Sequence, residues 1–512
     1  MFQPFFLLSP SYTGAIWVIL PLSVLALSLS SPRVRSRLND LLSAGINEYL
    51  LWRYPIRHTD LDRNIPTCPY RFPNGQGDVG KFLKGLENSE RWETKYGSVY
   101  RIWSGMRGEI VITRPDQLQT IFKDSDKHFK AVNNNSGYLM GQVLGKCLGL
   151  ISGQEWKAVR AAIEQPFLRR NASNYVDMVE KHVIRYMEDL HLHGALDRGL
   201  LDPAEDLKLL PFWVVAEIIY GELSPQMTQD LRELAPLREA LFRKVIAGGV
   251  SRFSFSRYLP TQANQLLAEF QGRWRSFNDG LYSLRKASKP EAPPIVHLYD
   301  RVLTGSITMD QMLQTLDESL YANLDVTIGA ISWNLVFLAA YPQYQKLLVE
   351  ELATHLAGEK SRQQYILSNS TLLAACVSES SRLRPLAAFS VPQSAPTPRV
   401  VDGYMIPGGV DFIVDSYGLN VRHEFWGPDS ASYRPERFLE KGALEMRYHF
   451  WRFGFGPRQC MGKYVADIIT RQLIVHIVEH YRLSLLEKTS GWARDPETWI
   501  NHPKMQIQCT RK

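Results

Sequence analysis

The chain has 512 residues, 45% hydrophobic and 22% charged, and this globular composition excludes a disordered or fibrous protein. Its 59 Lys and Arg residues outnumber its 52 Asp and Glu residues by 7, but they are dispersed, which argues against nucleic acid as a partner. The five cysteines are far apart and form no CxxC pair, which argues against a disulfide scaffold and a four-cysteine zinc site.

The N-terminus contains an apolar run within Thr13–Ser31, and no charged residue occurs before Arg33. About 20 apolar residues span a bilayer core. Arg33, Arg35 and Arg37 follow the run, so the positive-inside rule places the rest of the chain in the cytoplasm. A cleaved signal peptide, in which the positive segment comes first, and a buried segment are the alternatives.

A proline- and glycine-rich stretch at residues 65–78 (IPTCPYRFPNGQGD) indicates a linker. No other break of this kind follows it. We therefore predict a membrane anchor at residues 1–32, a basic flank and linker at 33–80, and one large domain at 81–512.

The first part of this domain shows two short strand patterns, Val99–Trp103 and Glu109–Thr113, which we expect to pair. A helix should begin after Arg114, because Pro115 suits a first helical position. Helical spacing then dominates from Ser152 to about residue 385.

The clearest helix begins at Thr308, where Thr308 and Gln311 form a capping box, and it ends at Pro342. Some 30 residues at about 1.5 Å each give a length on the order of 45 Å. Asn323 and Asp325 lie in its middle, and a buried carboxylate is costly unless it is paired or functional. This segment alone is also consistent with a core helix whose aspartate has a partner.

After Pro385 the pattern becomes β-like, with strands expected at Arg399–Tyr404 and Val410–Val414 and a turn at residues 407–409 between them. Helix resumes after Gly462. The chain is therefore predicted to be mainly α with a minor β part.

The stretch Phe453–Gly462 (FGFGPRQCMG) carries the strongest chemical signal. Its glycines and proline force a tight backbone to which a flat, bulky group has access. Cys460 ends this loop just before the next helix, whose N-terminal amides and dipole favour a thiolate, and Arg458 adds positive charge. The alternative for a lone cysteine is a small buried apolar residue.

This stretch resembles the heme-binding loop FxxGxRxCxG of the cytochrome P-450 superfamily, and it matches at Phe453, Gly456, Arg458, Cys460 and Gly462. The resemblance implies the cytochrome P-450 fold, a helical heme-thiolate domain with small β-sheets. It also implies heme b, with Cys460 as the metal ligand. A thiolate ligand pushes electron density onto the iron.

Two further motifs support the resemblance. Glu379 and Arg382 match the family's ExxR helix, and Arg437 matches its PERF segment, which implies a structural network of these three side chains. Trp156 and Arg160 match the WxxxR helix and are implied to bind the heme propionates, together with Arg458.

The resemblance also implies partners and a location. Electrons would come from NADPH only indirectly, through a membrane-bound NADPH–cytochrome P-450 reductase that docks on the cysteine side. That side offers the basic residues Arg452, Lys463, Lys157 and Arg458. The catalytic domain would face the cytoplasm on the endoplasmic reticulum membrane.

The long helix departs from the family's (A/G)-G-x-(D/E)-T-(T/S) motif, because residues 322–327 are ANLDVT. Asp325 retains the acid, Asn323 replaces a glycine, Val326 replaces the threonine, and Thr327 is turned roughly 100° away. We expect catalytic roles for Asp325, Asn323 and Thr327, with Asp325 as the only acid that crosses the heme. Protons could also come through water or from the substrate, or the chemistry could be coupling, ring closure or desaturation.

The ANLDVT segment and the aromatic run before the cysteine are similar to fungal members that tailor nonribosomal-peptide and diketopiperazine metabolites, including gliotoxin-type mycotoxins. The substrate would be an apolar small molecule in a pocket expected to include Tyr138, Ala322, Val326, Leu386, Ala387, Phe389 and either Trp492 or Trp499. The alternatives are a reductase-independent isomerase or dehydratase acting on a peroxide, and a non-catalytic heme sensor or structural membrane protein.

Overall fold

The computed structural model describes residues 31–512 except 289–291, 358–360 and 487–492, so most of the expected anchor and Trp492 lie outside the described residues. The α-helices are α2 (Pro32–Arg53), α3 (Gly85–Tyr96), α4 (Pro115–Phe122), α5 (Tyr138–Val143), α6 (Gly153–Ile163), α7 (Arg169–Ala172), α8 (Val176–His193), α9 (Leu210–Tyr220), α10 (Pro225–Ala247), α11 (Gln262–Arg285), α12 (Pro294–Leu303), α13 (Met309–Asp317), α14 (Leu324–Ala340), α15 (Pro342–Ala357), α16 (Arg362–Leu367), α17 (Leu372–Leu383), α18 (Arg437–Glu440), α19 (Ala443–Met446) and α20 (Lys463–His480).

The strands form three small sheets, which agrees with the predicted minor β part. One sheet has the order β1-β2-β8-β5-β3, the second β4-β10-β9, and the third is the β6–β7 hairpin. Their bounds are β1 (Val99–Ser104), β2 (Arg107–Ile112), β3 (Phe129–Lys130), β4 (Leu200–Leu201), β5 (Gln393–Ser394), β6 (Arg399–Val401), β7 (Tyr404–Ile406), β8 (Asp411–Val414), β9 (Tyr481–Leu485) and β10 (Ile507–Arg511).

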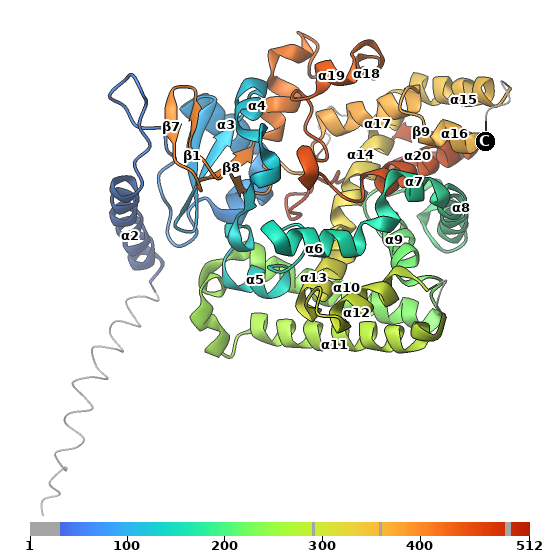
Figure 1. Cartoon of the computed structure of the whole chain (residues 1–512). Coiled ribbons are helices and arrows are strands. Elements are labelled where there is room, and N and C mark those ends of the chain that lie inside the picture. The colour runs from blue at the N-terminus through green and yellow to red at the C-terminus, as the bar shows by residue number, and fades with distance from the viewer. Residues whose placement is uncertain (1–30, 289–291, 358–360, 487–492) are drawn as a thin grey trace, which may run out of the picture.

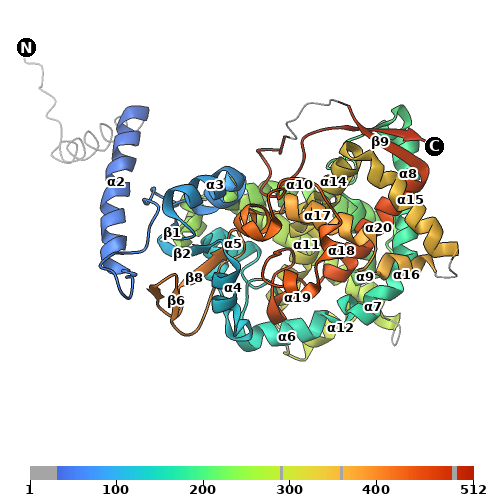
Figure 2. The same ribbon diagram turned by 90° about the horizontal axis from the view of Figure 1, so that it is seen from above.

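The sheet that contains β1 lies at one side of the molecule with α3 and α4, and α2 stands outside it, away from the long helices (Figures 1 and 2). Most long helices gather at the other side, where α14 contacts α9, α17 and α20. The second half of α14 is buried almost completely, so it forms the centre of the largest apolar core.

The expected pairing of the first two strands is confirmed, since β1 and β2 are antiparallel with Val99 opposite Ile112. The predicted start of α4 at Pro115 is also confirmed. The strand predicted over Arg399–Tyr404 is wrong: β6 and β7 fold back on each other at Asp402 and Gly403, both at positive φ. β8 pairs with β2 and β5 instead. An Asp-Gly pair is a strong signal for a tight hairpin turn, so the hairpin forms at residues 402–403 rather than at the glycines at 408–409.

The long helix begins with the predicted capping box, in which Thr308 Oγ1 accepts the Gln311 N–H and Gln311 Oε1 accepts the Thr308 N–H. It runs over Met309–Ala340 but is not regular, because a π-helical turn at Glu318–Ala322 separates α13 from α14. Within the described residues it is the one helix long and apolar enough to cross a membrane. Of its apolar 18-residue stretch, 67% is buried inside the fold.

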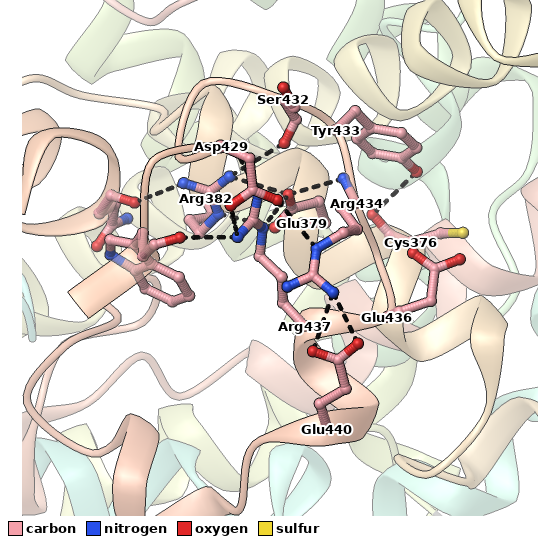
Figure 3. A network of polar contacts seen from close by, with 12 residues as sticks. Cys376, Glu379, Arg382, Asp429, Ser432, Tyr433, Arg434, Glu436, Arg437 and Glu440 are labelled. Carbon is pink, nitrogen blue, oxygen red and sulfur yellow. Dashed lines mark hydrogen bonds and ion pairs between the residues drawn. The ribbon is translucent and has the colours of Figure 1, made fainter. Parts of the chain in front are cut away.

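The predicted network of Glu379, Arg382 and Arg437 is confirmed (Figure 3). Arg382 Nε and Nη2 donate to the two Glu379 oxygens at 2.7 and 2.9 Å, and Arg437 Nε donates to Glu379 Oε1 at 3.2 Å. All three side chains are buried. Arg382 Nη1 also donates to the Asn420 carbonyl at 2.9 Å, and Arg437 Nη1 donates to the Trp426 carbonyl at 2.8 Å. The network therefore connects α17 to the loops that precede the cysteine.

We predict that Arg437→Ala lowers the free energy of unfolding by about 3–5 kcal/mol, because it leaves the Glu379 carboxylate buried with half of its positive partners. Denaturant titration of the holoprotein measures this. Arg434→Ala is the matched control, since Arg434 pairs with Glu440 at the surface and should contribute less than about 1 kcal/mol. Equal losses for the two variants would contradict a structural role for the buried network.

Candidate heme-thiolate site

The loop that carries Cys460 has the tight backbone expected from its glycines. Gly454 and Gly456 have φ values of 78° and 70°, in the left-handed region that favours glycine. At Gly456 a Cβ would lie 2.2 Å from Ser125 Oγ, so no larger residue fits there. The Cys460 N–H donates to the Phe453 carbonyl at 2.9 Å, which closes the loop and places Cys460 next to the N-terminus of α20.

Cys460 differs from the other four cysteines, which are all buried, because its surface is exposed. It nevertheless lies deep enough for burial to raise the pKa of its thiol. The Gly462 N–H and the charges of Arg160 and Lys463 lower that pKa, whereas Glu318 raises it. The donor and both cations thus favour the thiolate, the form that ligates metal ions.

Arg458 and Trp156 are in contact, as the motifs suggested. The Arg458 guanidinium lies over the Trp156 ring at 4.8 Å and donates to the Ile151 carbonyl at 2.7 Å. Arg160, one turn after Trp156 on α6, pairs instead with Glu164 at 2.7 Å. Phe453 lies under the Arg452 guanidinium at 4.4 Å. The five expected cofactor-binding residues therefore occupy one loop and the helix facing it.

Lys130 is a residue that the sequence motifs missed. Burial and the nearby Arg458 charge lower the pKa of its ammonium to about 7, while the Glu318 carboxyl acts in the opposite direction. Burial also lowers the pKa of Arg458, and Arg160 adds to that effect. The Lys130 ammonium forms no ion pair or hydrogen bond with any residue that the structure describes.

Lys130 and Arg458 share one protein carboxyl, Glu318, and Arg160 pairs with Glu164, so the positive charge of Lys130 and Arg458 exceeds the negative charge beside them and favours a further anion. Two heme propionates are such an anion, and Cys460 supplies the accessible sulfur on the same side. The residues present thus fit heme b: Cys460 would hold the iron, while Arg458, Lys130 and Trp156 would hold the propionates. A lysine on a two-residue strand carries no motif, so only the fold could reveal it.

The residues expected to be catalytic surround the π turn. Asn323 is exposed and directly precedes α14 without a capping hydrogen bond from its side chain, and Asp325 and Thr327 follow in the first turn. Asp325 is not isolated: Trp499 Nε1 donates to its Oδ2 at 3.0 Å, and Lys208 Nζ lies 3.7 Å from its Oδ1. The structure therefore supplies the partner that the core-helix interpretation required, although 19% of the side chain remains exposed.

Asp325 is the only acid of the expected catalytic segment at residues 322–327, and Glu318 lies four residues before that segment. Glu318, the first residue of the π turn, acts electrostatically on Cys460, Arg458 and Lys130. Burial raises its pKa to about 7. The sequence predicts a regular α-helix and gives no sign of the π turn. Such a prediction places the side chains before the π turn on the wrong face of the helix.

Two of the residues expected to line the substrate pocket, Phe389 and Trp499, pack against other side chains of the protein. Phe389 is fully buried against Trp92, with ring centroids 5.6 Å apart, so it belongs to the core. Trp499 packs on Phe82 and Phe242 and holds Asp325, so it lies beside the expected catalytic segment. Tyr138, Ala322, Val326, Leu386 and Ala387 are all partly exposed.

Comparison with known proteins gives a consistent result. The family model described as Cytochrome P450 matches residues 81–509. The cytochrome P450 monooxygenase aclC of Aspergillus oryzae is 51% identical over 91% of this chain and 95% of its own length. The monooxygenase asaD of Aspergillus flavus is 50% identical over 95% of this chain and 94% of its own, and gliC of Aspergillus fumigatus is 38% identical over 96% and 97%.

We predict that Lys130→Ala weakens heme retention by roughly 10–100-fold, because one charge-assisted hydrogen bond contributes about 1.5–3 kcal/mol. Transfer of heme to apomyoglobin measures the rate of loss. Lys127→Ala is the control, since Lys127 is exposed on the preceding turn. Retention that is unchanged in Lys130→Ala would show that this ammonium does not contact the cofactor.

Proposed function

We propose that this chain, which belongs to the cytochrome P450 family, oxidises an apolar small molecule of fungal secondary metabolism. It is a monooxygenase and therefore an oxidoreductase, with heme as its cofactor and NADPH-derived electrons delivered by a reductase. The observation that carries the proposal is the exposed Cys460 at the end of its glycine loop, with the cations Arg160 and Lys463 acting on its thiol and Arg458 of the same loop over the Trp156 ring. When bound there, heme supplies the oxygen-activating chemistry, assisted by its thiolate ligand.

The substrate class proposed is a nonribosomal peptide or diketopiperazine. The ANLDVT segment supports it, and similar proteins from Aspergillus species are monooxygenases of the same family. Apolar contact would come from Ala322, Val326 and Leu386, which are partly exposed. The exposed Asn323 amide both donates and accepts hydrogen bonds, so it complements a peptide or lactam group.

The metabolite profile of a strain that lacks the gene tests this substrate class. We expect a precursor with one or more peptide bonds to accumulate and its oxidised product to disappear. Complementation with the wild-type gene should restore the product, whereas complementation with Cys460→Ser should not. Accumulation of a precursor without any amide would contradict the proposed class.

Proton supply is the second part of the proposal. Asp325 would relay protons toward the pocket, with Asn323 and Thr327 positioning water, since the Val326 side chain cannot donate a proton. Lys208 and Trp499 keep the Asp325 carboxylate at the start of α14. Its side chain is partly exposed, which gives water access to the carboxylate.

We predict that Asp325→Asn slows product formation per heme by about 10²–10⁴-fold, the range typical of a general acid. Product per heme is measured with NADPH and reductase, and added hydrogen peroxide should partly restore it. Lys208→Met is the matched control, because it removes the ion pair and keeps the acid. If Asp325→Asn retains wild-type turnover per heme and only loses stability, as Lys208→Met would, the aspartate is a structural partner.

The proposed location is the endoplasmic reticulum membrane, with the catalytic part in the cytoplasm and residues 1–32 as a single-pass anchor. The apolar run followed by Arg33, Arg35 and Arg37 supports it. Among the three Asn-x-Ser/Thr sites, Asn134 is buried, so Asn171 and Asn369 are the informative reporters. Both should remain without glycan in a microsomal preparation, and a glycan on either would reverse the orientation.

The reductase would dock on the outer side of the cysteine loop. A hollow of about 270 Å³ lies there, lined by Phe122, Ser125, Arg447, Tyr448, Phe455, Gly456 and Gln459. Of the basic residues expected on this side, Lys157 is exposed, whereas Arg452 pairs with Asp467 and Arg458 points inward. Lys157 and Arg447 are therefore the better candidates for an acidic partner.

A further inference from the structure

Side chains on one face of the long helix accept hydrogen bonds from the backbone N–H groups of a non-helical segment, residues 146–149. Gln314 Oε1 accepts the Lys146 N–H at 2.6 Å, Thr315 Oγ1 accepts the Leu148 N–H at 3.1 Å, and Glu318 Oε2 accepts the Gly149 N–H at 3.0 Å. These three donors lie between α5 and α6 and have no helix to satisfy them. The side chains of α13 and the π turn therefore determine where residues 146–149 lie.

Glu318 fits this segment closely. A Cβ at residue 149 would lie only 2.0 Å from Glu318 Oε1, so the carboxylate occupies space that only glycine leaves free. The Cys147 thiol lowers the pKa of this carboxyl, against the larger effect of burial, which raises it. Glu318 is the first residue of the π turn, and π turns in long helices are frequent at functional sites.

The segment at residues 146–149 leads directly to the cations Arg458 and Lys130. Two residues after Gly149, the Ile151 carbonyl accepts the hydrogen bond from Arg458 Nη2. The Glu318 carboxylate also favours the charged forms of Arg458 and Lys130, and it opposes the thiolate of Cys460. The titratable and charged groups that act on Glu318 or respond to it are Asp317, Cys147, Arg458, Lys130 and Cys460.

We infer that Glu318 is a positioning residue of this oxidation site, and that it acts through two separable effects. Its oxygen fixes the 146–149 segment, and with it the carbonyl that orients Arg458, to the π turn of the substrate-side helix. Its negative charge balances Arg458 and Lys130 and acts on the electron density of the metal ligand. The inference rests on the family's monooxygenase activity and is independent of the proposed substrate.

Glu318→Gln separates the two effects, because the amide oxygen still accepts the Gly149 N–H while the charge is lost. The holoprotein should keep its heme content, and its heme midpoint potential should become more positive, since a nearby negative charge opposes reduction. The difference from wild type should be larger at pH 8 than at pH 6, because burial raises the Glu318 pKa to about 7 and the wild-type carboxyl is mostly neutral at pH 6. Glu155→Gln, an exposed acid on α6, is the control and should leave the potential unchanged.

The geometric effect is tested by hydrogen exchange of residues 146–149 in the same holoproteins. Protection should persist in Glu318→Gln and fall in Gly149→Ala, which expels the carboxylate. If Glu318→Gln loses its heme, Glu318→Asp is the variant to measure, because it keeps the charge on a shorter side chain. It should keep the wild-type midpoint potential, and its Gly149 amide should exchange faster than in the wild type. A Glu318→Gln potential equal to wild type at pH 8, or a Glu318→Asp protein with wild-type exchange and a shifted potential, overturns the inference.

Discussion

The buried carboxylate of Glu379 is the constraint on which the cysteine side of the molecule depends. A charge without water must be fully paired, and Glu379 obtains four donors: Arg382 twice, Arg437, and the Arg434 N–H at 3.0 Å. Both arginines then use their remaining groups on the carbonyls of Asn420 and Trp426. Satisfying one acid therefore fixes α17 and two distant loops relative to one another.

The network around Glu379 is connected to the cysteine loop through Asn420. Its side chain exchanges two hydrogen bonds with the Trp451 backbone, at 2.7 and 2.8 Å, only two residues before the cysteine loop begins at Phe453. Trp451 packs on Phe122 and Phe455, and Gly456 closes on Ser125. The loop is thus held from three sides, which leaves Cys460 accessible and directs Arg458 toward Trp156.

The sequence predicted the parts whose chemistry is local. The cysteine loop, the i,i+3 pair of Glu379 and Arg382, the capping box at Thr308 and the first two strands all depend on short-range spacing, and the structure contains each of them. Lys130, Glu318 and Lys208 were not predicted, because their roles come from residues distant in sequence. The π turn has no Gly or Pro to mark it, and the Asp402–Gly403 hairpin was missed because a second glycine turn lay nearby.

Held in this way, Cys460 would present a thiolate to heme iron from its loop. The absorption spectrum of the reduced protein with carbon monoxide tests it most directly. Wild-type protein should show the red-shifted Soret band of heme-thiolate proteins, and Cys460→Ser should lose that band. A Cys460→Ser protein that binds heme with an unchanged spectrum would contradict the assignment of Cys460 as the ligand.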